Sequence, residues 1–137
     1  MSAAQRFLVG IDGSREADRA LAFAVDLTRL AAADLYLVHA RTLPGANPAL
    51  AMSATLDALE ERAREAASVV LGRKLEANHV IARSGPAVEV LLMVAEELGA
   101  ALIVVGTAGE GHSVRGVLGS TAAQLVVRSR IPVVVVP

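Results

Sequence analysis

The chain has 137 residues, of which 54% are hydrophobic, 2% are aromatic and none is cysteine, and its net charge is −1. This length fits a single domain over residues 1–137, with a core built from Ala, Val, Leu and Ile. The near-neutral charge and the scarcity of aromatic rings argue against nucleic-acid binding, and the absence of cysteine excludes disulfides, zinc–thiolate sites and thiol catalysis.

Short apolar runs and helical periodicities alternate along the chain. In chain order we predict a strand at 7–11, a helix at 16–32, a strand at 35–39, a loop at 41–52, a helix at 53–76, a strand at 79–82, a helix at 86–98, a strand at 101–105, a helix at 120–128 and a strand at 132–137. Pro86 suits the first helical position and Gly99 a helix C-cap. This alternation is typical of a doubly wound α/β fold, in which helices cover both faces of a parallel sheet.

The N-terminal apolar run, residues 7–11, ends at Asp12. It is too short for the core of a signal peptide or for a membrane span. We therefore expect no membrane association and a cytoplasmic protein, with which the absence of cysteine is compatible.

Several charged residues are expected to have structural roles. The stretch 57–76 is rich in Glu and Arg, and we predict a solvated face on which Glu60 and Arg64 pair across one helical turn. We interpret His39 as a half-buried structural residue at a strand end, and His79 as a surface strand residue.

A glycine-rich loop is the strongest indication of function. Gly106-Thr-Ala-Gly109 follows the strand at 101–105, and after nine further residues Gly119-Ser120-Thr121 opens a helix. Glycine lets a ligand approach the backbone closely, and the free N–H groups of a first helical turn favour an anion. We predict a nucleotide or phosphate site, although the glycines could also serve only a strand-to-helix turn.

Five segments, in this order, resemble the universal stress protein family across nearly the whole chain. They are Val9-Gly-Ile-Asp12-Gly-Ser14, Leu37-Val-His39-Ala40, Ser84-Gly-Pro-Ala87, the string from Ile103 through Gly106 and Gly109 to Gly119-Ser120, and Ile131-Pro-Val-Val-Val-Val136. The Gly-x-x-Gly, nine residues, Gly-Ser pattern is that of the family's ATP-binding branch. The resemblance implies a Rossmann-like fold of the adenine nucleotide alpha hydrolase type, with five parallel strands in the order 3-2-1-4-5.

The resemblance also implies a binding site for ATP. Adenine is expected near Gly10, Ile11 and the backbone of Ala40, and the ribose hydroxyls at Asp12, since a carboxylate accepts from two hydroxyls at once. The remaining contacts are expected from Val105 and Gly106 beside the ribose and from Gly109, Gly119, Ser120 and Thr121 around the phosphates. Mg²⁺ would be bound mainly by phosphate oxygens and water. Asp12 and Ser14 can also cap the following helix, a role compatible with ribose binding.

Glu110 departs from the family pattern, in which a basic or neutral residue often follows the second glycine. A carboxylate there either points to solvent or weakens triphosphate binding relative to a monophosphate or cyclic ligand, unless Mg²⁺ or Arg115 offsets it. His112 could hydrogen-bond a terminal phosphate. The loop also lacks the lysine of a P-loop, so any ATP hydrolysis should be slow.

These observations favour an ATP-binding stress-response module that changes its protein partners with its nucleotide. The alternatives are a slow ATPase and a receptor for AMP or cyclic AMP. An apolar strand at a sheet edge is a template for pairing, and the family commonly dimerises through its last strand. We therefore predict a homodimer formed through Val133–Val136.

Overall fold

Strands and helices alternate along the chain as predicted. The computed structural model describes residues 3–41, 50–108 and 117–137, and side chains are not described for 50–53. The elements are β1 (Arg6–Gly10), α1 (Arg15–Ala31), β2 (Asp34–Arg41), α2 (Leu50–Leu71), a short 3₁₀ helix (Ala77–His79), β3 (Val80–Ser84), α3 (Ala87–Leu98), β4 (Leu102–Gly106), α4 (Ser120–Arg128) and β5 (Val133–Val136). Within the described part of the chain, no helix has both the length and the apolar character needed to cross a membrane.

The five strands form one parallel sheet in the order β3-β2-β1-β4-β5, which confirms the predicted architecture. β1 lies at the centre, where Val9 pairs with Leu37 of β2 on one side and Val104 of β4 on the other. The strand order therefore reverses beside β1, and a crevice opens at the carboxyl ends of β1 and β4.

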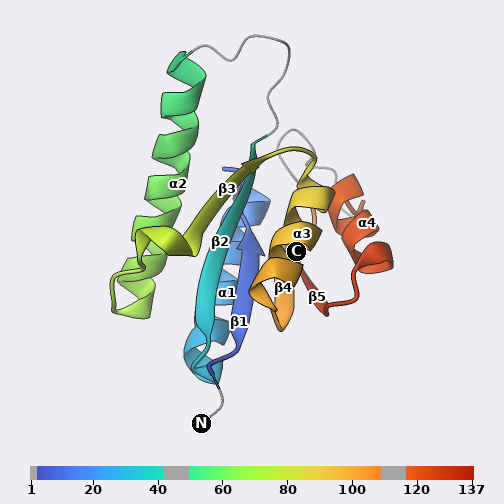
Figure 1. The fold of residues 1–137 in the computed structure, drawn as a ribbon, viewed down its shortest axis with the longest axis horizontal. Helices are drawn as coiled ribbons and strands as arrows, with labels where there is room; N and C mark the ends of the chain where they lie inside the picture. Colours follow the sequence, from blue (N-terminus) through green and yellow to red (C-terminus); the bar gives the residue numbers. More distant parts are fainter. Residues whose placement is uncertain (1–2, 42–49, 109–116) are drawn as a thin grey trace.

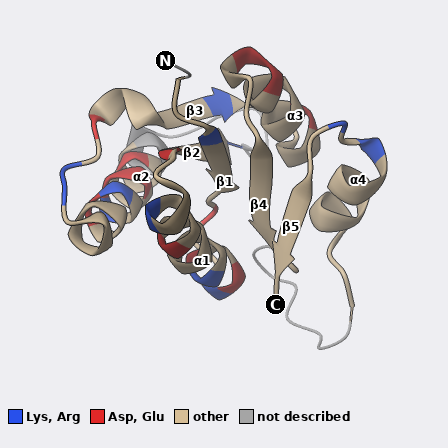
Figure 2. Cartoon of the chain, turned by 90° about the horizontal axis from the view of Figure 1, so that it is seen from below, with Lys and Arg blue, Asp and Glu red and all other residues tan. Residues whose placement is uncertain are grey.

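Two helices cover each face of the sheet (Figures 1 and 2). Side chains alternate along a strand, so Phe7 and Val9 of β1 face the core beneath α1 and α2, whereas Leu8 faces the core beneath α3 and α4. Both cores are aliphatic, as the composition requires. Thus the chain buries its apolar strands on both faces.

The structure moves some predicted boundaries. The second helix ends at Leu71 rather than at 76, because Gly72 has a φ of 69° and turns the chain out of the helix. Pro86 is the N-cap of α3 rather than its first residue, while Gly99 caps the C-terminus with a φ of 61° as predicted. Most of the predicted loop at 41–52 lies outside the described residues.

Candidate functional site

A pocket of about 420 Å³ opens at the carboxyl ends of β1 and β4, beside the start of α4; we call it the strand-end pocket. Nine of the ten predicted nucleotide-site residues line it: Gly10, Ile11, Asp12, Ala40, Val105, Gly106, Gly119, Ser120 and Thr121. The tenth, Gly109, lies outside the described residues, as do Glu110, His112 and Arg115. The structure thus brings together residues from four separate stretches of the chain.

Other residues of the pocket were missed by the sequence analysis. The additional lining comes from Ala17, Val38, Ala87, Leu91, Ala108 and Ala122. Val38 could have been found, because it lies two residues before Ala40 and therefore on the same face of β2. The contribution of α3 had no such signal, since it depends on how this helix packs against the sheet.

The turn after β1 directs Asp12 into the pocket. Ser14 caps α1 by accepting a hydrogen bond from the Ala17 N–H at 3.1 Å. One carboxylate oxygen of Asp12 accepts from the Ser14 N–H at 2.8 Å, and within the described residues the other oxygen has no partner. Asp12 is therefore held in place while keeping an acceptor for a ligand.

Gly106 is required by packing in addition to any role in binding. A Cβ at this position would lie 2.7 Å from the backbone carbonyl of Glu16, in the first turn of α1. The absence of a side chain therefore lets α1 approach the end of β4. The structural interpretation of this glycine and the ligand-binding one are compatible.

Gly119 differs from the expectation that its N–H would face a phosphate. This N–H donates to the Thr107 carbonyl oxygen at 2.6 Å. A Cβ on Gly119 would lie 3.0 Å from the Ala108 Cα, so the glycine lets the two sides of the loop approach each other. The predicted donor is thus already used in this structure, and Gly119 shapes the loop instead.

The start of α4 offers the remaining donors. No side chain caps this helix, and the first backbone bond runs from the Ala123 N–H to the Gly119 carbonyl at 3.0 Å. Helix geometry leaves the N–H groups of Ser120, Thr121 and Ala122 without intrahelical acceptors. Together with the helix dipole, these groups make one wall of the pocket favourable for an anion.

An ion-pair network lies next to Ala40, on the α2 side of β2. The Arg41 guanidinium donates to Glu60 at 2.7 and 2.9 Å and to Asp57 at 2.5 Å, and the Nδ1 of buried His39 lies 2.7 Å from Glu60. Burial acts to raise the pKa of Glu60, but hydrogen bonds from Arg41 and His39 outweigh it and hold this pKa below its ordinary value. The hydrogen bonds that Arg41 makes to Glu60 and Asp57 in turn raise the pKa of Arg41. The network ties α2 to the sheet.

Two predictions about charged residues are therefore wrong. Arg64 pairs with Glu61 rather than Glu60, because Glu60 reaches β2 and is not on a solvated face. His79 is not a surface strand residue, because its ring stacks on Tyr36 at 4.2 Å and its Nδ1 contacts the Leu35 carbonyl at 2.9 Å. The histidine instead secures the 3₁₀ turn against β2.

The strand-end pocket combines an apolar wall, one carboxylate and backbone donors. No group of three or more Asp, Glu or His side chains is arranged to hold a metal ion in the part of the chain that the structure describes. This combination suits binding of a polar ligand with an apolar ring, and its chemistry comes mainly from the main chain.

Comparison with known families gives a match over nearly the whole sequence. The model of the universal stress protein family matches residues 3–137. A universal stress protein of Synechocystis sp. is 34% identical over 134 residues, covering 95% of this chain and 83% of that protein.

Solved structures agree with this match. A universal stress protein crystallised in complex with cyclic AMP is 28% identical, with a TM-score of 0.76 over 99% of this chain and 98% of that one. A member of the same family from Burkholderia pseudomallei is also 28% identical, with a TM-score of 0.63 over 98% of this chain and 96% of that one.

Proposed function

The chain belongs to the universal stress protein family, and from this premise we propose that it binds an adenine nucleotide in the strand-end pocket. The proposed ligand is ATP with Mg²⁺, and the proposed role is that of a cytoplasmic stress-response module. One observation carries the proposal: a ligand-facing carboxylate at the end of β1 and the uncapped start of α4 line the same pocket.

The nucleoside is proposed to lie across the ends of β1 and β2. Gly10, Ile11 and Ala40 provide backbone and apolar surface for adenine, and the free carboxylate oxygen of Asp12 accepts from a ribose hydroxyl. Val105 and Gly106 flank the sugar. The cyclic AMP complex of a relative with 28% identity supports an adenine nucleotide as the ligand class.

The phosphates are proposed to meet the first turn of α4. The N–H groups of Ser120 and Thr121 and the Ser120 hydroxyl are the donors. Gly109, the further donor expected from the family resemblance, lies outside the described residues. Mg²⁺ would be held by phosphate oxygens and water, as this hard ion usually is. Binding at this turn would change the surface offered to protein partners, so that the choice of partner depends on the nucleotide.

The experiment that tests this proposal is thermal unfolding with adenosine, AMP, cyclic AMP and MgATP. At about 100 times its dissociation constant, a ligand adds about 2.7 kcal/mol of stability. Ser120→Pro removes an N–H and the hydroxyl at the first helical position, where proline is tolerated, and Ser120→Ala removes only the hydroxyl. We expect Ser120→Pro to reduce the increase in unfolding temperature caused by MgATP and to leave the increase caused by adenosine unchanged. The reduction should be larger than that in Ser120→Ala.

The results also separate the alternatives. Stronger stabilisation by cyclic AMP or AMP than by MgATP would favour a receptor for those ligands. This is the second candidate function, because a relative has been crystallised with cyclic AMP. An ATP-hydrolysing activity that follows the protein through purification and is lost in Ser120→Pro would favour a slow ATPase. No stabilisation by any of these ligands, in protein first freed of bound nucleotide, would contradict the proposed site.

We also propose that the protein is a homodimer paired through β5. This strand is at the sheet edge, its four valines are half-buried, and beside it α4 exposes Val126 and Val127, which are 54% and 84% exposed. Arg128 is the single charged residue of α4, in contrast to the mixed charges along α1 and α2 (Figure 2). An apolar, weakly charged edge of this kind favours self-association.

A proline at position 135 tests the dimer. The carbonyls of Pro132 and Val136 face β4, so by alternation the N–H of Val135 faces away from the sheet. Val135→Pro should therefore preserve the fold and disrupt pairing, whereas Val135→Thr keeps both the N–H and the β-branched shape. We expect light scattering to give a monomer for Val135→Pro and a dimer for Val135→Thr. A dimer in both variants would place the interface elsewhere.

A further inference from the structure

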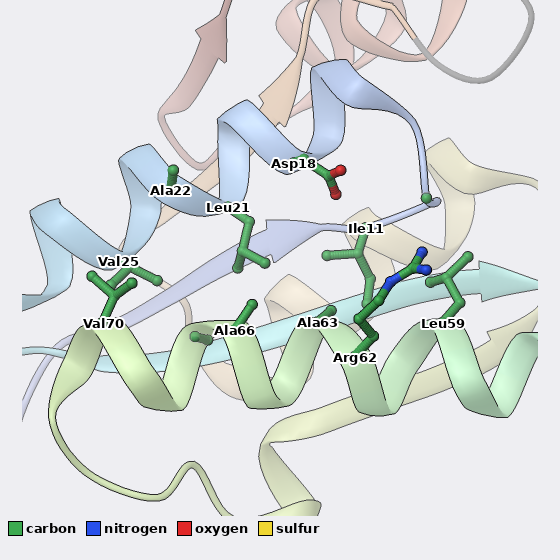
Figure 3. A pocket seen from close by; sticks show the side chains of 12 residues that line it. Ile11, Asp18, Leu21, Ala22, Val25, Leu59, Arg62, Ala63, Ala66 and Val70 are labelled. Carbon is green, nitrogen blue, oxygen red and sulfur yellow. The ribbon is translucent and has the colours of Figure 1, made fainter.

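A second pocket, of about 290 Å³, lies between α1 and α2, the two helices that cover one face of the sheet; we call it the interhelical groove (Figure 3). Its walls are apolar. Leu21 and Val25 come from α1, and Leu59, Ala66 and Val70 from α2. The volume is at the lower end of the range for small-molecule pockets, which is about 300–1,000 Å³.

Two opposite charges lie at one end of the interhelical groove. Figure 3 shows Asp18 on α1 and Arg62 on α2 near Leu59, while Val25 and Val70 approach each other at the other end. Within the described residues, neither of these charged side chains has a hydrogen bond or an ion pair, and they do not pair with each other. Their neighbours Glu60, Glu61 and Arg64 are all paired.

An apolar pocket with an unpaired cation and an unpaired anion at one end has a definite chemical complement. A ligand with a single carboxylate would meet Arg62 but would face repulsion from Asp18, and a ligand with a single ammonium group would face the reverse. A zwitterion satisfies both charges. An apolar α-amino acid carries both charges on one carbon and an apolar chain beyond it.

We propose that the interhelical groove binds a small apolar α-amino acid. Its carboxylate pairs with Arg62, its ammonium group pairs with Asp18, and its side chain points toward Val25 and Val70. The groove shares Ile11 with the strand-end pocket but none of the polar groups assigned to the nucleotide. This inference therefore does not depend on the proposed function, and its test contains no nucleotide.

The probe is L-leucine, titrated into the isotope-labelled protein and followed by NMR amide shifts. Two analogues separate the charges: isocaproate is L-leucine without the amino group, and isoamylamine is L-leucine without the carboxylate. We expect L-leucine to bind more tightly than either analogue and to shift the amides of Ala22 and Ala66. A pair of exposed charges contributes only modestly, so removing one should weaken binding about threefold.

Charge variants assign each contact. Arg62→Gln should weaken L-leucine and isocaproate but not isoamylamine, and Asp18→Asn should weaken L-leucine and isoamylamine but not isocaproate. Ala66→Leu should fill the groove and abolish binding; Ala66 is exposed, so the variant should fold. Ala58→Leu is the matched control, because Ala58 is exposed on the same helix and does not line the groove.

Three results would overturn the proposal. They are the absence of any L-leucine binding by the wild-type chain, equal binding of L-leucine and both analogues, and L-leucine binding that persists in Ala66→Leu. A thermal unfolding midpoint measured for each variant without ligand shows that a loss of binding is not a loss of fold.

Discussion

The strand-end pocket and the interhelical groove share the side chain of Ile11 but are built from different parts of the chain. The strand-end pocket takes its polar groups mainly from the backbone, at the end of β1 and the start of α4. The interhelical groove takes its chemistry from side chains on two helices. Consequently, an added Cβ at a glycine should damage the first pocket most, whereas the second should respond to side-chain size and charge.

Gly106→Ala should have the largest effect on stability and should disturb both pockets. Its Cβ would lie 2.7 Å from the Glu16 backbone, so α1 must move away from the end of β4. Because α1 borders both pockets, we expect a loss of about 3 kcal/mol in the free energy of unfolding and weaker nucleotide binding. Urea denaturation measures the loss. Gly10→Ala is the control, since its Cβ would meet Leu91 at an ordinary 3.4 Å; equal stability of the two variants would contradict the packing argument.

Glu60→Gln should cause the next largest loss of stability. The loss should be confined to the side of the sheet covered by α2, where the interhelical groove lies. Glu60 accepts hydrogen bonds from Arg41 and lies against His39, and these anchor α2 to β2. Hydrogen bonds to charged groups contribute about 1.5–3 kcal/mol, so we expect a loss of about 2 kcal/mol at neutral pH. Glu61→Gln, one residue along the same helix, should change the unfolding midpoint little because Glu61 is exposed.

The pH dependence of stability sharpens the Glu60 prediction. The folded state lowers the pKa of Glu60 below the ordinary value of 4.5, because hydrogen bonds from Arg41 and His39 outweigh the effect of burial. The stability from its ionised form is therefore present above about pH 4.5 and is lost as the pH falls through the lower folded pKa. The difference in the free energy of unfolding between wild type and Glu60→Gln should therefore shrink as the pH is lowered. A difference that grows would contradict this assignment.

Asp12→Ala should affect the strand-end pocket and leave the interhelical groove intact. Loss of the ribose acceptor should weaken adenosine binding about tenfold, equivalent to about 1.4 kcal/mol. Asp12→Asn keeps an oxygen for the Ser14 N–H and so separates turn stability from ligand binding. Calorimetric titration measures both variants, and unchanged adenosine affinity in each would exclude Asp12 as a ligand contact.

Ile11→Val should have the smallest effect on stability and ligand binding. It tests whether Ile11 contributes to ligand binding in both pockets. Ile11 is 6% exposed, and loss of one methylene from such a site costs about 1 kcal/mol. We expect small reductions in the affinities for both adenosine and L-leucine. A change in only one of these affinities would show that Ile11 belongs functionally to one pocket.

Much of the strand-end pocket could be predicted because its parts are local in sequence. Glycines after β4, a serine at the start of a helix and an aspartate after β1 are each set by a few neighbouring residues. Their convergence required the parallel topology, in which carboxyl ends share one edge, and a strand order that makes β1 and β4 neighbours. Side chains from α3, such as Leu91, could not be assigned, because helix position against a sheet depends on the whole core.

The sequence by itself determined the alternation of strands and helices, the parallel α/β class and the glycine-rich stretch that opens α4, because periodicity and turn chemistry act over short distances. Only the tertiary structure decided that Glu60 pairs with Arg41 rather than Arg64, that the Gly119 N–H bonds to Thr107, and that Asp18 and Arg62 lie at one end of the same groove. These outcomes depend on which helix packs against which strand. That choice is made by the burial of two aliphatic cores, and no local pattern in the chain records it.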